Sequence, residues 1–120
     1  MTKKSLNLII LIAFVTIVIV GTLFMFNKTS APTSGTILYY GQQCPHCIKV
    51  EEFIKNNNLD TKIQITKKEI WYNQANAAEM INKANICGLP TATVGVPFLW
   101  DGTKCYTGDT DIINWLASNL

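Results

Sequence analysis

The longest hydrophobic segment of the chain lies near its N-terminus, where residues 6–26 are almost entirely apolar. Its polar members are Asn7, Thr16 and Thr22, and no charged residue interrupts it. A helix of this length measures about 32 Å at ~1.5 Å per residue, close to the hydrocarbon thickness of a bilayer. The segment therefore predicts one transmembrane helix.

The charges beside this segment predict its orientation. Lys3 and Lys4 precede it and only Lys28 follows closely, so the positive-inside tendency places residues 1–5 in the cytoplasm. A cleaved secretory signal is the alternative, but the apolar run exceeds the usual signal core of about 7–15 residues and no clean cleavage site follows. In both cases the rest of the chain is expected to be extracytoplasmic.

Residues 27–35 lack hydrophobic periodicity and contain Pro, Gly, Ser and Thr, which is typical of a flexible linker. The remaining residues 36–120 form the predicted folded body. Its first stretch, residues 36–40, is short, β-prone and almost wholly apolar, as in a strand covered on both faces. Helical spacing then begins at the first cysteine, with four apolar positions on one face: Cys47, Val50, Phe53 and Ile54.

The following stretches predict a second strand, a second helix and a hairpin. Residues 62–66 alternate with period two, and residues 73–86 carry an apolar stripe that Asn73 can cap. Residues 96–100 and 104–107 flank an Asp-Gly pair, which is a strong signal for a tight turn between strands.

A last helix is predicted to begin at Asp109 or Thr110, either of which can cap it. Its core-facing residues are expected to be Ile112 or Ile113, Leu116 and Leu120. The helix between the first two strands predicts a parallel pair, and the hairpin predicts an antiparallel edge. The expected fold class is α/β, in the order β-α-β-α-β-β-α with a mixed four-stranded sheet, preceded by one N-terminal transmembrane helix.

Composition and charge exclude two classes of protein. Hydrophobic residues make up 48% of the chain and charged residues 15%, which excludes a disordered chain. The charged residues comprise 10 lysines and 8 acids, a formal net charge of +2, so no concentrated basic face for nucleic acid is expected.

The sequence Cys44-Pro45-His46-Cys47 stands where the first strand meets the first helix. At a helix N-terminus, unpaired N–H groups and the helix dipole stabilise the thiolate of Cys44 over its thiol. Pro45 suits the first turn, and the spacing brings Cys47 within disulfide reach on the same face. A protonated His46 would stabilise the thiolate further, which favours the dithiol and makes the disulfide an oxidant.

A metal site and a structural disulfide are weaker interpretations of this cysteine pair. A zinc site completed by Cys87 and Cys105 is disfavoured because their spacing does not form a second knuckle, so no metal is expected. A purely structural bond from Cys44 to Cys47 would close too small a loop to constrain much chain entropy. His46 as an inert surface residue stays open as an alternative.

The body resembles the thioredoxin superfamily, and within it the glutaredoxins in size and element order, with the Cys-Pro-His-Cys sequence of DsbA-type secreted oxidants. Three motifs carry the resemblance: Cys44 to Cys47, Gly95-Val96-Pro97 and Thr107-Gly108-Asp109. It implies a thioredoxin-like fold and a thiol–disulfide oxidoreductase that oxidises thiols of exported proteins. A quinone-linked membrane partner would reoxidise it, and no organic cofactor is needed.

The resemblance also implies a substrate-binding segment. Pro97 would be cis beside the cysteine pair, leaving the backbone of Val96 free to pair with an extended substrate. A trans Pro97 that starts an edge strand, and a Val96 that only packs, are the alternatives. Glutathione binding is not expected, because Thr107-Gly108 replaces the double glycine of glutaredoxins and His46 replaces their tyrosine.

Cys87 and Cys105 have no counterpart in these motifs. Export permits a second disulfide, and the chain-entropy model assigns a loop of this size roughly 3 kcal/mol. A structural bridge is favoured, with two unpaired thiols or a second redox relay as alternatives. For the whole chain, the alternatives to an oxidase are a reductase on the same fold and a non-enzymatic metal-binding module.

Overall fold

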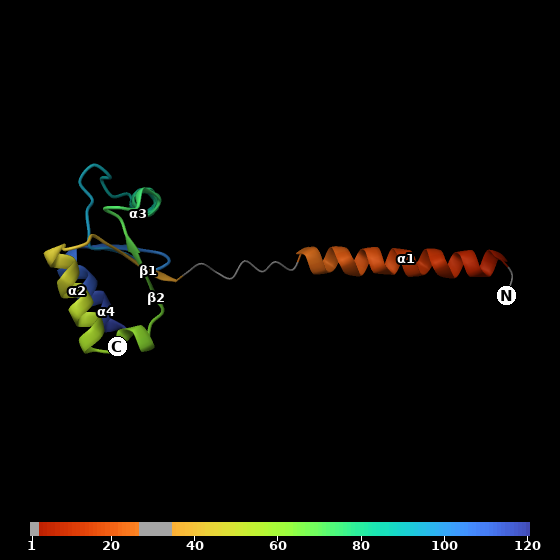
Figure 1. The fold of residues 1–120 in the computed structure, drawn as a ribbon, viewed down its shortest axis with the longest axis horizontal. Helices are drawn as coiled ribbons and strands as arrows, with labels where there is room; N and C mark the ends of the chain where they lie inside the picture. Colours follow the sequence, from red (N-terminus) through yellow and green to blue (C-terminus); the bar gives the residue numbers. More distant parts are fainter. Residues whose placement is uncertain (1–2, 27–34) are drawn as a thin grey trace. The chain divides into compact units, whose positions relative to one another are not determined.

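The computed structural model describes residues 3–26 and 35–120. The predicted linker lies outside the described residues except for Gly35, as do the first two residues of the predicted cytoplasmic segment 1–5. The chain divides into two compact units, each considered by itself. The elements are α1 (Lys3–Phe26), β1 (Thr36–Tyr40), α2 (Pro45–Asn56), η1 (Leu59–Thr61), β2 (Ile65–Glu69), α3 (Gln74–Ile86), β3 (Phe98–Trp100), β4 (Cys105–Thr107) and α4 (Gly108–Ser118) (Figure 1).

The N-terminal unit holds α1, which confirms the predicted apolar helix and begins three residues before the predicted span. The window Lys3–Val20 has a mean hydropathy of 2.1 and none of it is buried. The helix is therefore long and apolar enough to cross a membrane. A secretory signal would meet the same test of length and composition.

The body is built on a sheet with the strand order β2-β1-β3-β4. Strand β1 pairs in parallel with β2 and antiparallel with β3, and β3 pairs antiparallel with β4. Leu38 at the centre of β1 lies opposite Lys67 on one side and Leu99 on the other. The predicted mixed four-stranded sheet and its element order are confirmed.

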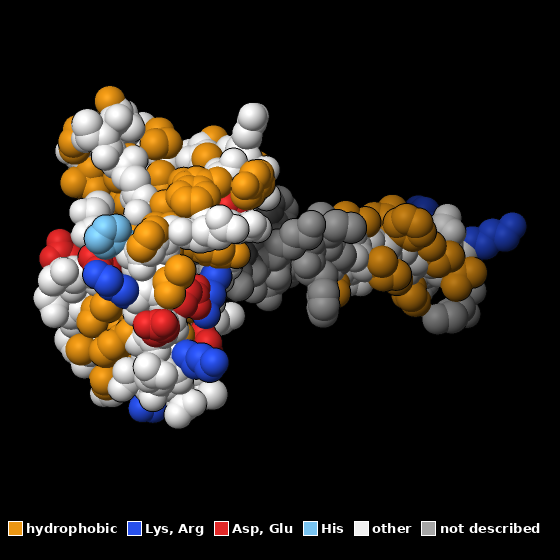
Figure 2. Space-filling model, turned by 60° about the vertical axis from the view of Figure 1, so that its left-hand side comes forward, with side chains coloured by type: hydrophobic (Ala, Val, Ile, Leu, Met, Phe, Trp, Pro, Cys, Tyr) orange, Lys and Arg blue, Asp and Glu red, His pale blue; other side chains and the backbone are white. Residues whose placement is uncertain are grey.

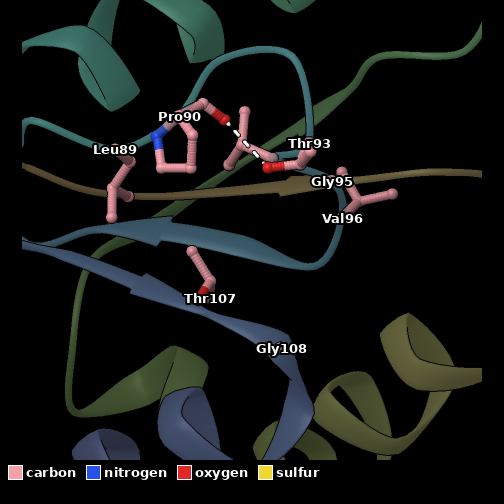
Figure 3. Close-up of a pocket in the computed structure, with 8 residues that line it drawn as sticks. Leu89, Pro90, Thr93, Gly95, Val96, Thr107 and Gly108 are labelled. Atoms are coloured by element: carbon pink, nitrogen blue, oxygen red, sulfur yellow. Dashed lines mark hydrogen bonds between the residues drawn. The ribbon is translucent and has the colours of Figure 1, made fainter.

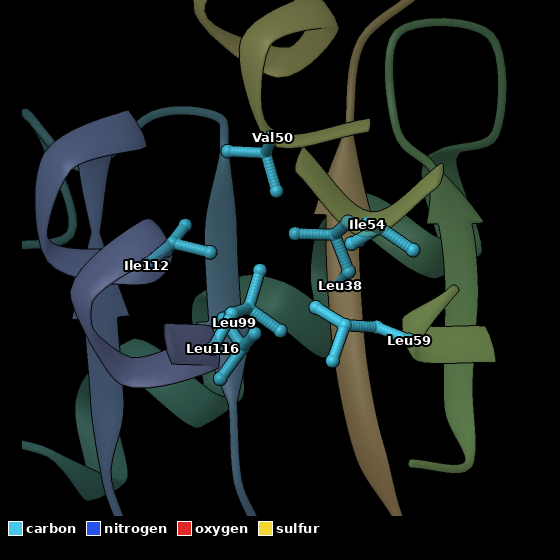
Figure 4. Packing of buried hydrophobic residues seen from close by; sticks show 7 residues of the cluster. All are labelled: Leu38, Val50, Ile54, Leu59, Leu99, Ile112 and Leu116. Atoms are coloured by element: carbon cyan, nitrogen blue, oxygen red, sulfur yellow. The ribbon is translucent and has the colours of Figure 1, made fainter. Parts of the chain in front are cut away.

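Helices cover both faces of this sheet, which is why the first strand is almost wholly apolar. On one face α2 and α4 pack over Leu38 and Leu99, and the whole cluster is drawn in Figure 4. On the other face Met80 and Ala84 of α3 pack with Tyr39 and other residues of the central strands. Burying one such large side chain stabilises the fold by about 1.5–3 kcal/mol, so both layers contribute to holding the helices against the sheet.

The second strand is displaced from its predicted position. It begins at Ile65 rather than at residue 62, because the preceding residues form η1, in which the amides of Lys62 and Ile63 donate to the carbonyl of Leu59. Leu59 is fully buried and anchors this turn. The strand is polar because it lies at the sheet edge, where Lys67 is paired with an acid of α2, at 2.8 Å.

The predicted start and end of the last helix are wrong. Helix α4 begins at Gly108, directly after β4, and neither Asp109 nor Thr110 caps it. Gly108 has a φ of 80°, which favours glycine, and its amide donates to the carbonyl of Pro97 at 3.0 Å. Because the helix ends at Ser118, Leu120 lies beyond it and is 56% exposed. Ile112 and Leu116 are buried, as predicted.

Two local predictions are confirmed. Asn73 caps α3, where its side-chain oxygen accepts from the amide of Asn76 at 3.1 Å. Asp101 closes the hairpin, where its carboxylate accepts from the amides of Thr103 and Lys104. Such side-chain acceptors satisfy backbone donors that the ends of a helix or turn leave unpaired.

Candidate active site

The first cysteine pair lies at the start of α2. Cys44 is the residue that caps this helix, and its sulfur accepts a hydrogen bond from the amide of Cys47 at 3.3 Å. Pro45 occupies the first turn, where the missing N–H costs nothing. The sulfur of Cys44 therefore lies where backbone N–H groups and the helix dipole stabilise an anion.

The two sulfurs of this pair have different surroundings. Both are free thiols in this structure, and Cys44 is 5% and Cys47 3% exposed. Burial, followed by the hydrogen bond to Cys44, raises the pKa of the Cys47 thiol to about 12. Cys47 therefore remains a thiol at neutral pH, which suits a residue that reacts second.

The segment before β3 contacts the first cysteine. The thiol of Cys44 donates to the carbonyl oxygen of Val96 at 3.9 Å, and the Val96–Pro97 peptide bond is cis. The Pro97 carbonyl in turn accepts from the amide of Gly108 at the start of α4. Three motifs far apart in the sequence thus meet at one end of the sheet.

His46 is held by a residue that the sequence did not indicate for this role. Its Nδ1 lies 3.2 Å from Oδ2 of Asp109, and Nζ of Lys49 lies 3.1 Å from the same oxygen. The contact with His46, followed by that with Lys49, lowers the pKa of Asp109 to about 2. Figure 2 shows the exposed histidine, the only one in the sequence, beside basic and acidic side chains.

This ion-pair group changes the interpretation of Asp109. The sequence predicted it as a helix cap, whereas it lies in the first turn of α4 and contacts the first turn of α2. The spacing of His46 and Lys49 by three residues was the one available signal, because residues three apart share a helix face. The carboxylate therefore determines where the imidazole lies and offsets its charge when it is protonated.

A pocket of about 290 Å³ adjoins this end of the sheet (Figure 3). The loop after α3 forms most of it through six residues: Leu89, Pro90, Thr93, Val94, Gly95 and Val96. Thr107 and Gly108, where β4 passes into α4, complete the lining. None of these eight described residues carries a charge.

A second depression borders the cysteine pair. It measures about 400 Å³, and Gly41, Cys47 and Ile48 are among the residues that line it. The ring of Trp71 packs directly on Gly41, where a Cβ atom would overlap it. The backbone that leads into Cys44 is therefore in close contact with an aromatic side chain that is itself half exposed.

The second cysteine pair forms a disulfide. The Cys87–Cys105 bond has an S–S length of 2.04 Å and a Cα–Cα distance of 6.2 Å, and it joins the end of α3 to the first residue of β4. Because these cysteines are bonded to each other, they do not complete a zinc site with the first pair.

Comparisons with known proteins do not assign a family to the chain. A scan against models of protein families finds no match, and a search among curated proteins finds none either. The geometry of the site is therefore the basis for assigning a function to the chain.

Proposed function

We propose that the body has a thioredoxin-like fold and that the chain is a membrane-anchored, extracytoplasmic thiol–disulfide oxidoreductase. One observation carries this proposal: the sulfur of Cys44 caps α2 and accepts from the amide of Cys47, whose own sulfur is buried beside it. A sulfur in this position is a good nucleophile and a good leaving group because its anion is stabilised. The mixed sheet order and the contact between Cys44 and Val96 support the fold assignment.

The proposed direction is oxidation of the thiols of exported proteins. A substrate thiolate attacks the sulfur of Cys44 in the oxidised pair, the S–S bond breaks, and Cys47 takes the electron pair and a proton. A second substrate thiolate then attacks the substrate sulfur of the mixed disulfide and releases Cys44 as a thiolate. Two electrons pass from the substrate to the pair, and of the two protons released one goes to Cys47 and one to solvent.

Reoxidation requires an acceptor of two electrons. A quinone-linked membrane protein is the proposed partner, which α1 would keep close by anchoring the chain in the lipid bilayer with its N-terminus in the cytoplasm. The chain itself needs no organic cofactor for this exchange, since the electrons are stored in the two sulfurs.

A reductase on the same fold is the second candidate, and one observation favours it. Asp109 lies 3.2 Å from Nδ1 of His46, so the positive charge of the imidazole is offset and does less to stabilise the Cys44 thiolate. A less stable dithiol is a better reductant. The reduction potential of the cysteine pair separates the candidates. A DsbA-like oxidant has a potential of about −120 mV and a thioredoxin-like reductant one of about −270 mV.

The test begins with trapping. In the native cells, Cys47→Ala should accumulate mixed disulfides with exported proteins: the Cys44 thiolate attacks a disulfide of the exported protein, one of its sulfurs leaves as a thiolate, and the second sulfur that would release the adduct is missing. The matched control, Cys44→Ala, should accumulate none. Complete absence of adducts with Cys47→Ala contradicts both directions. Alkylation of the unmodified protein then decides between them: a mostly oxidised pair supports the oxidase, and a mostly reduced pair supports the reductase.

A further inference from the structure

The uncharged pocket of about 290 Å³ has a lining that restricts what it can bind. A charged group placed in it would lose water without gaining an ionic partner, which is costly. An apolar group would enter it at little cost and gain from burial. Its volume is close to the smallest volumes of ligand pockets, about 300 Å³. It therefore suits one side chain rather than a whole tripeptide.

The pocket lies next to the reacting sulfur. Val96 belongs to its lining, and the carbonyl of the same residue lies 3.9 Å from the sulfur of Cys44. Consecutive residues of an extended chain are about 3.3 Å apart. A polypeptide attached to Cys44 through its own cysteine therefore has the side chains of the neighbouring residues within reach of the pocket.

The nearest acid in the sequence does not supply a free charge to the pocket. Asp109 directly follows the lining residue Gly108, but both His46 and Lys49 contact its carboxylate. Nζ of Lys49 compensates its charge, and Nδ1 of His46 occupies the same oxygen. An amino group, such as that of glutathione or a substrate lysine, would have to compete with them for this oxygen.

The walls of the pocket are formed before a substrate arrives. The loop carries its own hydrogen bonds, in which Thr93 and Val94 donate to the carbonyl of Pro90. The Cys87–Cys105 disulfide holds the residue just before the loop against the start of β4. Binding in a preformed site loses less affinity to the ordering of the protein.

We propose that this pocket binds an uncharged, apolar side chain adjacent to the reacting cysteine of a polypeptide substrate, and so selects such cysteines over glutathione and over cysteines with charged neighbours. This inference rests on the proposed function, since it names the substrate class for Cys44. It is independent of the direction of electron flow.

The test uses the oxidised full chain in detergent and two reduced dithiol peptides that differ only in a Leu or a Glu beside the first cysteine. The unmodified protein should oxidise the Leu peptide about tenfold faster, the discrimination typical of one apolar side chain in a pocket. Gly95→Leu should remove this preference, because Gly95 lines the pocket and an added Cβ there meets no atom within 4 Å. The rate of the unmodified protein with glutathione should be lower than with the Leu peptide.

Two further variants make the result specific. Gly35→Leu is the matched control, since a Cβ at Gly35 also meets no atom within 4 Å and the residue is not part of the pocket lining; it should keep the preference. Thr93→Lys places a cation at an exposed position of the lining and should shift the preference toward the Glu peptide.

Equal rates for the two peptides with the unmodified protein, or an undiminished preference in Gly95→Leu, would overturn the inference. Reduction of the Cys44–Cys47 disulfide by dithiothreitol, followed by mass spectrometry of the alkylated cysteines, reports on the pair itself. If the pair exchanges with dithiothreitol and with both peptides equally, the selectivity is wrong. If the pair does not exchange with any thiol, the proposed function is wrong instead.

Discussion

The body contains two cysteine pairs at opposite kinds of helix end. Cys44 caps the N-terminus of α2, where amides face its sulfur, whereas Cys87 caps the C-terminus of α3, where carbonyls predominate. The first environment stabilises a thiolate and the second does not. The first pair spans three positions and the second eighteen, so the first is suited to exchange and the second to crosslinking. Position on the helix, rather than the cysteine itself, separates the two roles.

The largest effect is expected from breaking the first pair. Cys44→Ala should abolish oxidation of a dithiol peptide, because the sulfur that a substrate is proposed to attack is gone and Cys47 alone cannot form the disulfide that accepts the two electrons. The stability of the fold should change little. Quenched alkylation and mass spectrometry of the peptide measure the rate, and appreciable activity in Cys44→Ala would show that the roles are assigned to the wrong sulfur.

The second pair should show the opposite pattern. Replacing both Cys87 and Cys105 with Ala should lower the free energy of unfolding by roughly 3 kcal/mol, since a crosslink of this length restricts the unfolded chain. Exchange of the Cys44–Cys47 pair with dithiothreitol should persist. Urea unfolding of the full chain in detergent measures the first quantity. A double variant that keeps its stability but loses exchange would indicate a redox relay instead.

The glycines beside the two pairs sharpen the comparison. Gly41→Ala should cost about 1–3 kcal/mol, as overpacking does, and should slow exchange because it displaces Trp71 next to the segment that leads into Cys44. Gly88→Ala should cost about 1–2 kcal/mol because Gly88 has a φ of 69°, without altering exchange with dithiothreitol. Gly35→Ala, where a Cβ meets open space, is the control. Unfolding curves and tryptophan emission together separate these outcomes.

The parts of the fold that could be predicted are those determined by local chemistry. The apolar run of β1, the Asp-Gly turn and the spacing of the first cysteine pair each depend on a few neighbouring residues. The start of β2 was misplaced because the turn η1 precedes it, and its polar end was missed because that polarity reflects the sheet edge, which depends on the whole sheet. The contact of Asp109 with His46 was missed because it requires α4 to begin beside α2, and no local pattern reports such packing.

The smallest predicted effect concerns this contact, which links the first turns of α2 and α4. The pKa of Asp109 falls from its ordinary value of 3.8 to about 2, first through His46 and then through Lys49. A carboxyl whose pKa is lower in the folded state stabilises the protein above the unfolded pKa and loses that contribution as pH falls through the folded one. The part of the stability due to Asp109 should therefore decline between about pH 5 and pH 2.

Asp109→Asn should flatten this acid dependence in urea unfolding curves, while Asp111→Asn serves as the control. Asp111 is an acid of the same first turn that pairs with neither His46 nor Lys49 in the described part of the chain. Because His46 is 62% exposed, the effect should be small and should shrink further in 1 M salt, where the screening length is about 3 Å. The same variant should raise the reduction potential, since it removes a negative charge from beside the first turn of α2 and so favours the Cys44 thiolate. An unchanged potential would mean that the contact of Asp109 with His46 acts only as a link between the two helices.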